Sequence, residues 1–430
     1  MTADINKRIK AIRAGKVPAG YKKTILGIIP EDWDVVRFRD RFTRVTRKNT
    51  EGNSNVLTIS AQYGLINQNE FFNKTVASDD KSNYFLLSKG EFAYNKSYSN
   101  GYPFGALKRL EYYDKGVVSP LYICFAANEL NKQPDYYVQY FEAGLMNREI
   151  QAFAQEGARN HGLLNISVDD FFNSNLICPP IDEQQKIADI LTTQDKIIEQ
   201  KERIIAERKI QKSILTEQLI SGKKRLSGYN NPWKNISLRD CCYTDGQYGL
   251  NTPACEYKDG LPKYIRITDI TEDGRYDLNS KAYANVDGYD DYILKNDDIL
   301  LVRTGSTTGK SYLYNEKDGE LVYAGFLIRF SINPQIIDSK FVASALNTTE
   351  YWKWVRVMSK RSGQPGINST EYSRYEFKIP GDVKESQAIA KVLSTAADEI
   401  TLLQKDLEQE KLKKKSLMQL LLTGIVRVSA

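Results

Sequence analysis

Histidine is nearly absent from this sequence, which has a single one, His161, among 430 residues. The five cysteines show no Cys-x-x-Cys spacing and no neighbouring histidine, so the ligand pattern of a zinc site is missing. Scattered cysteines without an export signal predict reduced thiols and a cytoplasmic protein. No apolar run approaches the ~20 residues of a membrane span, so we expect no membrane contact.

Catalytic motifs are also scarce. Residues 305–311 (GSTTGKS) resemble a phosphate loop, but three residues separate the glycines where that loop has four, and residues 312–314 (YLY) are typical of a strand rather than a helix. The Glu-x-Lys triplets at 256–258 and 376–378 lack the preceding Pro-Asp of metal-dependent nucleases. We therefore predict no catalytic residues, no metal site and no cofactor on this chain.

The sequence does contain a long duplicated stretch. Residues 183–222 and 385–424 align without a gap at an offset of 202, and both interrupt a seven-residue apolar ladder with a lysine, Lys212 or Lys414. Such a ladder predicts a helix that packs lengthwise against another helix, here ~60 Å long at ~1.5 Å per residue. Two unrelated surface helices are the alternative. The predicted helix seam consists of Leu191, Ile198, Ile205, Leu215, Leu219, Leu393, Ile400, Leu407, Leu417 and Leu421.

The regions before each helix repeat as well. Trp33 and Trp233 begin similar segments, and in both regions short strand-like runs alternate with turns before a helical piece at about 134–154 or 339–357. We expect a mixed α/β fold with the two tryptophans as core anchors. The predicted segments are an N-terminal helical segment (1–20), a first globular domain (21–180), a central long helix (181–226), a second globular domain (227–380) and a C-terminal long helix (381–430).

Two polar, basic and aromatic loops stand out, residues 95–102 and 303–310, each after a predicted strand. Guanidinium, ammonium, amide and hydroxyl groups of this kind bind phosphates and base edges, although solvated hairpin turns would look similar. With 60 Lys and Arg against 54 Asp and Glu, the chain is mildly basic, which permits a polyanionic partner without requiring one. The candidate DNA-binding residues are Arg47, Lys48, Gln62, Tyr63, Asn95, Lys96, Ser97, Tyr98, Asn100, Tyr102, Arg159, Asn160, Gln247, Tyr248, Arg266, Arg303, Thr304, Ser306, Thr307, Thr308, Lys310, Lys360, Arg361 and Gln364.

Several short segments, taken together, resemble the specificity subunit of type I restriction–modification enzymes. In the two globular regions they are 59–65 (ISAQYGL), 90–95 (GEFAYN), 118–122 (VSPLY), 162–167 (GLLNIS), 265–270 (IRITDI), 297–305 (DDILLVRTG) and 366–368 (GIN). At the long helices they are 180–188 (PIDEQQKIA) and 420–424 (LLLTG), whereas 385–387 (ESQ) departs from the usual Glu-Gln start.

The resemblance implies two target recognition domains of mixed α/β build, 21–180 and 227–380, which each read half of a split target in double-stranded DNA. It implies that the long helices form an antiparallel coiled coil with an internal pseudo-two-fold repeat, which sets the unread spacer. Two methyltransferase (M) subunits and two restriction (R) subunits are the implied partners, and they carry the S-adenosylmethionine, Mg²⁺ and ATP.

Two alternatives remain open on the sequence alone. The tyrosine-rich loops would also suit a coiled-coil scaffold with two protein- or sugar-binding domains, and a reader fused to its enzyme is the other possibility. Sequence-specific, salt-dependent binding of duplex DNA distinguishes the first alternative from DNA recognition. Methyl transfer by the chain alone would support the second. A further expectation concerns Ile190, Ile197 and Ile204, an apolar stripe on the first helix that we expect to pack against a recognition domain or a partner subunit.

Overall fold

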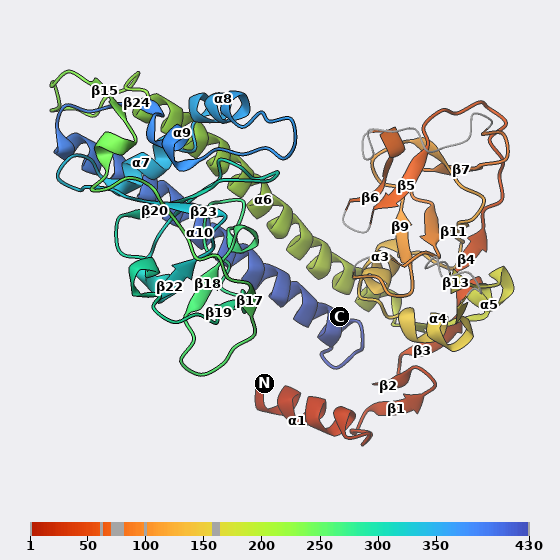
Figure 1. Ribbon diagram of the computed structural model, residues 1–430. Helices are drawn as coiled ribbons and strands as arrows, with labels where there is room; N and C mark the ends of the chain where they lie inside the picture. The colour runs from red at the N-terminus through yellow and green to blue at the C-terminus, as the bar shows by residue number, and fades with distance from the viewer. Residues whose placement is uncertain (1, 61–62, 70–80, 99–100, 157–163, 429–430) are drawn as a thin grey trace. The chain divides into compact units, whose positions relative to one another are not determined.

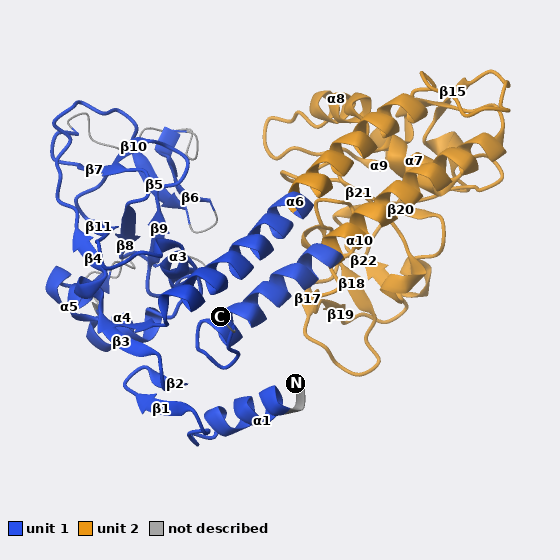
Figure 2. Ribbon diagram, turned by 180° about the vertical axis from the view of Figure 1, so that it is seen from behind, with its two compact units in different colours: residues 1–201, 406–430 blue, residues 202–405 orange. Residues whose placement is uncertain are grey.

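The computed structural model describes residues 2–60, 63–69, 81–98, 101–156 and 164–428 (Figure 1). Its contacts divide the chain into two compact units, residues 1–201 with 406–430 (unit 1) and residues 202–405 (unit 2) (Figure 2). Each unit contains part of both long helices, α6 (Ile181–Ile220) and α10 (Val383–Leu421). In the described ranges no helix is both long enough and apolar enough to cross a membrane.

The globular part of unit 1 is built on an antiparallel sheet with the strand order β4-β11-β8-β9. Five phenylalanines on and around this sheet form its buried centre: Phe38, Phe42, Phe92, Phe125 and Phe141. The strands of the sheet are β4 (Phe42–Arg44), β11 (Ile123–Ala127), β8 (Phe92–Asn95) and β9 (Ala106–Arg109).

Smaller strand pairs and short helices complete unit 1. The pairs are β1 (Tyr21–Thr24) with β2 (Gly27–Pro30), β3 (Asp34–Arg37) with β14 (Asn175–Cys178), β5 (Leu57–Ser60) with β6 (Gly64–Asn67), β7 (Phe85–Ser88) with β10 (Lys115–Val118), and β12 (Gln155–Glu156) with β13 (Leu164–Asn165). The helices are α1 (Thr2–Arg13), η1 (Phe38–Asp40), α3 (Pro134–Glu142), α4 (Asn147–Phe153) and α5 (Val168–Asn173).

Unit 2 repeats this plan with an antiparallel sheet in the order β16-β23-β20-β21. Its strands are β16 (Gln247–Tyr248), β23 (Leu327–Ser331), β20 (Asp298–Val302) and β21 (Ser311–Leu313). A second sheet contains β17 (Ala254–Cys255), β19 (Tyr283–Ala284), β18 (Lys263–Ile265) and β22 (Leu321–Tyr323), and β15 (Lys234–Ser237) pairs with β24 (Glu376–Ile379). The short helices are η2 (Arg239–Cys241), η3 (Ile267–Asp269), η4 (Asp290–Tyr292), η5 (Glu316–Asp318), α7 (Ser339–Ala345), α8 (Thr349–Met358) and α9 (Ser369–Ser373).

The sheets and helices confirm the predicted mixed α/β build. The helical piece expected at 339–357 is split into α7 and α8 because Thr348 caps a new helix, its hydroxyl accepting the N–H of Tyr351 at 3.3 Å. The piece expected at 134–154 is likewise split into α3 and α4, at Gly144, whose φ of +69° is in the left-handed region. Residues 312–313 lie in β21, so the GSTTGKS loop joins two strands and does not open a helix.

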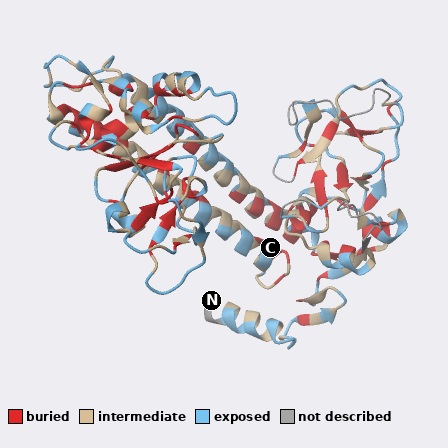
Figure 3. Ribbon diagram, in the orientation of Figure 1, coloured by how far each residue is buried: buried red, intermediate tan, exposed pale blue. Residues whose placement is uncertain are grey.

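The long helices bury most of their predicted seam (Figure 3). Leu191, Ile205, Leu219, Leu393, Ile400, Leu407 and Leu421 are buried, and Ile198, Leu215 and Leu417 are partly buried. Of the second apolar stripe, Ile190 and Ile197 are partly buried whereas Ile204 is 40 % exposed. Ile190 packs against the main hydrophobic core of unit 1.

Polar contacts show the direction in which the helix segments pair. In unit 1, Lys201 of α6 pairs with Asp406 of α10, whereas Gln194, earlier in α6, donates to Glu410, later in α10, at 2.6 Å. In unit 2, Arg208 pairs with Glu399 at 3.3 Å. In unit 1 the contacting residues of α10 therefore come earlier as those of α6 come later, so these two helix segments run in opposite directions.

A glutamate at the start of each long helix accepts hydrogen bonds from an arginine and a tryptophan. Glu183 accepts hydrogen bonds from Trp33 Nε1 at 2.8 Å and from Arg427 Nη2 at 2.7 Å. Its counterpart Glu385 is fully buried and accepts from Arg225 Nη2 at 2.7 Å and from Trp233 Nε1 at 3.3 Å. We call these two groups the end clasps. Trp33 is fully buried, as predicted for a core anchor, and Trp233 is partly buried.

Candidate nucleic-acid interface

The two loops singled out from the sequence occupy corresponding places in the two units. Residues 96–105 join β8 to β9, and residues 303–310 join β20 to β21. The strands joined by each loop, β8 and β9 or β20 and β21, are the third and fourth strands of their sheet. The second strand, β11 or β23, separates them from the short edge strand β4 or β16. Each unit thus presents one equivalent hairpin loop, which is the geometry expected for a duplicated reading element.

The loop of unit 2 is held by backbone contacts. Thr304 forms a β-bridge with Gly366, and the Gly305 N–H donates to the Pro365 carbonyl at 3.0 Å. The Thr308 hydroxyl donates to the Gly305 carbonyl at 2.7 Å, which closes the loop on itself. A loop fixed at several points presents its side chains in one arrangement, which base recognition requires.

Arg303 lies at the base of this loop beside a cavity of about 730 Å³. Its guanidinium lies 4.7 Å from the centroid of the Tyr248 ring, whose hydroxyl accepts the Ser369 N–H at 3.1 Å. In the described part of the chain, Arg303 has no carboxylate partner. An arginine supported by an aromatic ring and not neutralised by an acid keeps its planar fork available for a base edge or a phosphate.

The wall of this cavity depends on a close approach of two backbones. The Leu250 N–H donates to the Tyr323 carbonyl at 2.8 Å, and the Gly325 N–H donates to the Leu250 carbonyl at 2.7 Å. A Cβ on Gly249 would lie 2.3 Å from the Tyr323 carbonyl oxygen, so only glycine fits there. Tyr248 and Phe326 both line this cavity, and Phe326 is 59 % exposed.

The corresponding loop of unit 1 presents tyrosine to solvent. Tyr98 is 63 % exposed, and Tyr63, at the turn between β5 and β6, is 54 % exposed. The Asn95 side chain accepts the Ser97 N–H at 3.1 Å and so shapes the start of the loop. Lys96 is partly buried, and this burial lowers its pKa. Exposed tyrosines suit stacking on bases, and Lys96, which has no ion-pair partner among the residues that the structure describes, suits binding of phosphates.

Several predicted residues already have partners inside the protein. Arg47 pairs with Glu91 at 2.7 Å, Lys48 donates to the Asn83 carbonyl at 2.7 Å, and Tyr102 donates to Glu142 at 2.8 Å. In unit 2, Arg266 pairs with Asp269 at 2.9 Å, Lys310 donates to the Ile270 carbonyl at 2.8 Å, Arg361 binds both oxygens of Glu371 at 2.7 Å, and Gln247 accepts from Arg329. Any contact of these side chains with DNA would have to share or replace such bonds.

The remaining predicted residues divide by exposure. Ser306, Lys360 and Gln364 are exposed, Thr304 and Thr307 are partly buried, and Thr308 is buried. The predicted residues Gln62, Asn100, Arg159 and Asn160 lie outside the described residues.

Sequence reasoning missed Phe326 and Asn251, which both line the cavity beside Arg303. Residues 326–330 (FLIRF) have the composition of an apolar strand, yet β23 begins at Leu327 and Phe326 is exposed. The Gly-Phe pair at 325–326 is the signal that could have indicated a bend before the strand. Asn251 carries no such signal. Among the described residues, no group of three or more His, Cys, Asp or Glu side chains could hold a metal ion.

Comparison with known proteins agrees with this arrangement. The chain is 23 % identical to the putative type I restriction enzyme MjaX specificity subunit of Methanocaldococcus jannaschii over 95 % of this chain and 97 % of that protein. It is 22 % identical to the type I restriction enzyme MjaVIII specificity subunit of the same organism, over 65 % of this chain and 68 % of the relative. Among solved structures, a chain from a study of the assembly and conformational transition of the type I R-M system shares the fold, with a TM-score of 0.57 and 13 % identity over 93 % of this chain and 99 % of that one.

The family assignment rests on two matching regions. Residues 30–208 and 230–412 each match the family described as the type I restriction modification DNA specificity domain. Together these regions contain both hairpin loops and most of both globular regions and both long helices. The chain therefore belongs to the type I restriction modification DNA specificity domain family.

Proposed function

We propose that this chain is the DNA-recognition subunit of a type I restriction–modification complex and is not itself an enzyme. Residues 21–180 and 227–380 act as two target recognition domains, and each reads one half of a bipartite target in double-stranded DNA. The observation that carries the proposal is the equivalent hairpin loop in each unit, with Arg303 stacked on Tyr248 and without an acidic partner in unit 2. Family membership and the relatives named as specificity subunits support it.

In this proposal the long helices set the distance between the half-sites. They act as an antiparallel coiled coil with pseudo-two-fold symmetry, residues 181–226 and 381–430. The opposite direction of the paired helix segments in unit 1 supports this interpretation. The two end clasps support it as well, because their glutamates and their arginines correspond at an offset of 202 residues. Half-site spacing in DNA-binding proteins follows from the distance between the two readers.

The proposed partners follow from the same function. Two methyltransferase subunits dock on the helices and two restriction subunits join that core, so S-adenosylmethionine, Mg²⁺ and ATP belong to those subunits. The complex acts in the cytoplasm on cellular DNA. The apolar residues Ile204, Ile210 and Ile214 of α6, which are 40 %, 62 % and 54 % exposed, would be covered by a docked subunit.

Filter binding with a randomised duplex library, in the presence of the methyltransferase subunit, tests the proposal. We expect enrichment of a split sequence and an affinity that falls steeply with salt, because phosphate contacts release counterions. Arg303→Ala is the matched variant and should lose preference in one half of the target only. Salt-insensitive binding, or no enriched sequence with the partner present, would contradict DNA recognition and favour a protein- or sugar-binding scaffold.

A further inference from the structure

Two lysines at equivalent positions of the helix seam, Lys414 and Lys212, have different surroundings. In unit 1, Lys414 of α10 pairs with Asp195 of α6 at 2.5 Å, and Gln139 of α3 donates to the other oxygen of Asp195 at 2.8 Å. At the offset of 202 residues, Lys414 corresponds to Lys212 and Asp195 corresponds to Ala397. Unit 2 therefore keeps the lysine and lacks the carboxylate that neutralises it.

Lys212 has no substitute partner. Across the described residues it forms no ion pair and no hydrogen bond through its ammonium group. Burial lowers its pKa, the positive charge of Arg275 lowers it further, and Asp273 opposes both effects. A partly buried ammonium next to a guanidinium is the electrostatic setting that an additional negative charge would stabilise.

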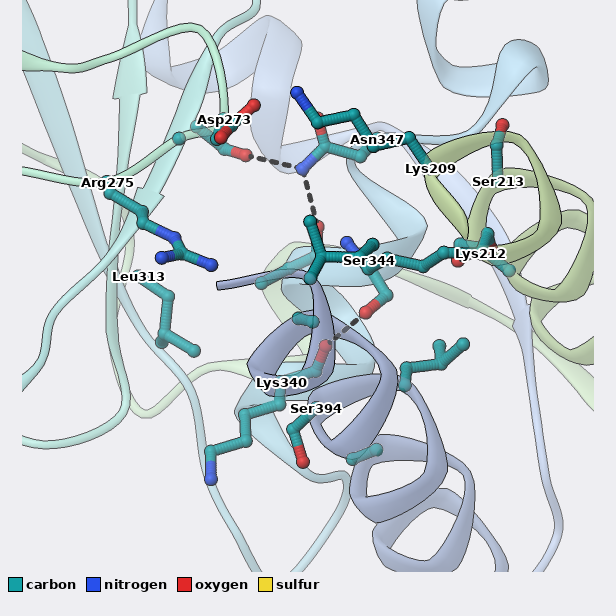
Figure 4. A pocket seen from close by; sticks show the side chains of 18 of the residues that line it. Lys209, Lys212, Ser213, Asp273, Arg275, Leu313, Lys340, Ser344, Asn347 and Ser394 are labelled. Atoms are coloured by element: carbon teal, nitrogen blue, oxygen red, sulfur yellow. Dashed lines mark hydrogen bonds between the residues drawn. The ribbon is translucent and has the colours of Figure 1, made fainter. Parts of the chain in front are cut away.

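A cavity of about 490 Å³ opens in front of Lys212, entirely within unit 2 (Figure 4). Leu393, Ala397 and Ile400 of α10 form its apolar side. Ser344 of α7 also lines the cavity. Ala397, which stands at the position of Asp195 in the repeat, thus faces an open space in unit 2.

The charges around the cavity are mixed. Lys209, Lys212, Arg275 and Lys340 line it together with Glu217, Glu272 and Asp273. Glu217 accepts the Thr349 N–H at 2.5 Å, and Arg275 donates to the Thr401 hydroxyl at 2.9 Å, so both are already oriented by the protein. Lys212 is the cation that projects toward the cavity from the seam itself (Figure 4). The Ser344 and Ser394 hydroxyls also line the cavity, but they already donate to the Lys340 carbonyl at 2.8 Å and to the Lys391 carbonyl at 3.0 Å.

We propose that this cavity is a binding site for a small oxyanion, a phosphate or carboxylate group carried by a small molecule, which takes the place that the Asp195 carboxylate has in unit 1. The anion accepts hydrogen bonds from the Lys212 ammonium, and Arg275 adds long-range attraction. The cavity volume leaves room for an organic group on the anion, against the apolar side formed by α10. The site lies at the helix seam and does not depend on the proposed DNA recognition.

Thermal unfolding of the full chain, titrated with inorganic phosphate or with acetate at ionic strength matched by sodium chloride, tests the site. For the wild type we expect a saturable rise in Tm with phosphate, acetate or both, because a ligand that binds only the folded state stabilises it. Ala397→Asp restores the missing carboxylate, so it should raise Tm without added anion and remove the anion-dependent rise. Lys212→Met should weaken anion binding at least tenfold by calorimetry.

Lys414→Met is the control in unit 1, where the site is already filled by Asp195. It should lower Tm because it leaves Asp195 without its lysine, yet it should leave the anion response unchanged. A wild-type response no larger than that to chloride would overturn the proposal. Retention of the full response by Lys212→Met would also overturn it, and this variant decides the matter even if Ala397→Asp does not fold.

Discussion

Arg303 and Lys310 flank the same hairpin loop of unit 2 but have different surroundings. Arg303 stacks on Tyr248 at 4.7 Å and has no acidic partner in the described structure, whereas Lys310 donates to the Ile270 carbonyl at 2.8 Å. From the sequence both residues are equally good candidates for DNA contact. The structure distinguishes the two candidates. A lysine that already donates to a carbonyl gains less binding free energy from a phosphate than an arginine without a polar partner among the described residues.

Replacement of Arg303 by alanine should therefore affect recognition rather than stability. We expect Arg303→Ala to weaken binding of the specific duplex by about 1–3 kcal/mol, as for loss of one bidentate base contact, with Tm nearly unchanged. Lys310→Ala should instead cost about 1 kcal/mol of stability through the unsatisfied Ile270 carbonyl and leave target preference intact. Fluorescence anisotropy with each half-site altered in turn, together with thermal unfolding, checks both variants. Equal losses at both half-sites for Arg303→Ala would contradict separate readers.

Asp269 gives unit 2 a pH-dependent contribution to stability. Burial alone raises the pKa of Asp269, but the hydrogen bonds from the side chain and backbone N–H of Arg266 outweigh burial and lower the pKa. A carboxyl whose pKa is lower in the folded state stabilises the fold above its unfolded pKa of about 3.9, and loses this contribution as pH falls through the folded pKa. We expect Asp269→Asn to be less stable than the wild type at neutral pH, and we expect this difference in stability to shrink as pH falls below about 3.9. Chemical unfolding across that pH range measures the difference, and a constant difference would contradict this assignment.

At the scale of elements, the end clasps fix where each long helix begins. Glu385 is fully buried and binds Arg225 and Trp233, which lie near the end of α6 and the entrance of the globular region. Gly222 has a φ of +71°, and a Cβ there would approach the Trp233 ring to 3.2 Å. The clasp thus packs the turn after one helix against the first turn of the other.

Removal of the clasp glutamate Glu385 should lower the stability of the fold far more than removal of the exposed glutamate Glu399. Glu385→Ala leaves a partly buried arginine and an indole N–H without their acceptor, so we expect a loss of roughly 3 kcal/mol. Glu399→Ala breaks the exposed pair with Arg208 on the same helix and should cost less than about 1 kcal/mol. Denaturant unfolding of the two variants measures the difference, and similar losses would show that the clasp is not a stability element.

The sequence predicts the elements better than it predicts their contacts. The heptad ladder identifies the buried seam because the period alone determines which side of a helix is apolar. The clasps join Glu183 to Arg427 and Glu385 to Arg225, residues far apart in the chain, and no local pattern indicates such pairs. The hairpin loops were predicted as binding elements, but the bracing of Thr304 by Gly366 and the stacking of Arg303 on Tyr248 are tertiary contacts that local composition does not encode.

At the scale of the whole molecule, both ends of the chain contribute to unit 1. The Tyr21 hydroxyl donates to the Gly424 carbonyl at 2.7 Å, and Arg8 of α1 donates to the Ile425 carbonyl at 2.7 Å. Met418, Leu421 and Leu422 at the end of α10 belong to the same buried core as Trp33. The core of unit 1 therefore includes residues from the end of α10, and the core of unit 2 includes residues of both long helices, so these helices are part of each unit's core as well as the proposed spacer.

The proposed spacer role makes a prediction about helix length. Lys201 of α6 pairs with Asp406 of α10, so one heptad inserted between Gln200 and Lys201 needs a matching heptad between Asp406 and Leu407 to keep the contacts on either side. The paired insertion lengthens both helices by ~10 Å, which is about three base pairs of duplex at ~3.4 Å each. We expect the preferred spacer to grow by about three base pairs. Three additional base pairs turn one half-site by roughly 100° about the axis of the duplex. One heptad turns the end of a helix by only ~20°. The two rotations do not match, so we expect the affinity for DNA to fall.

Selection from a library of targets with varied spacers, in the presence of the methyltransferase subunit, measures this change. The single insertion in α6 alone is the matched control. It displaces Gln194 from Glu410 and Asp195 from Lys414, so it should lower stability and reduce binding at every spacer length. If the paired insertion keeps the original spacer, the helices do not set it. The distance between half-sites would then have to come from flexibility between the globular regions and the helices, and the exposed heptad positions would serve docking alone.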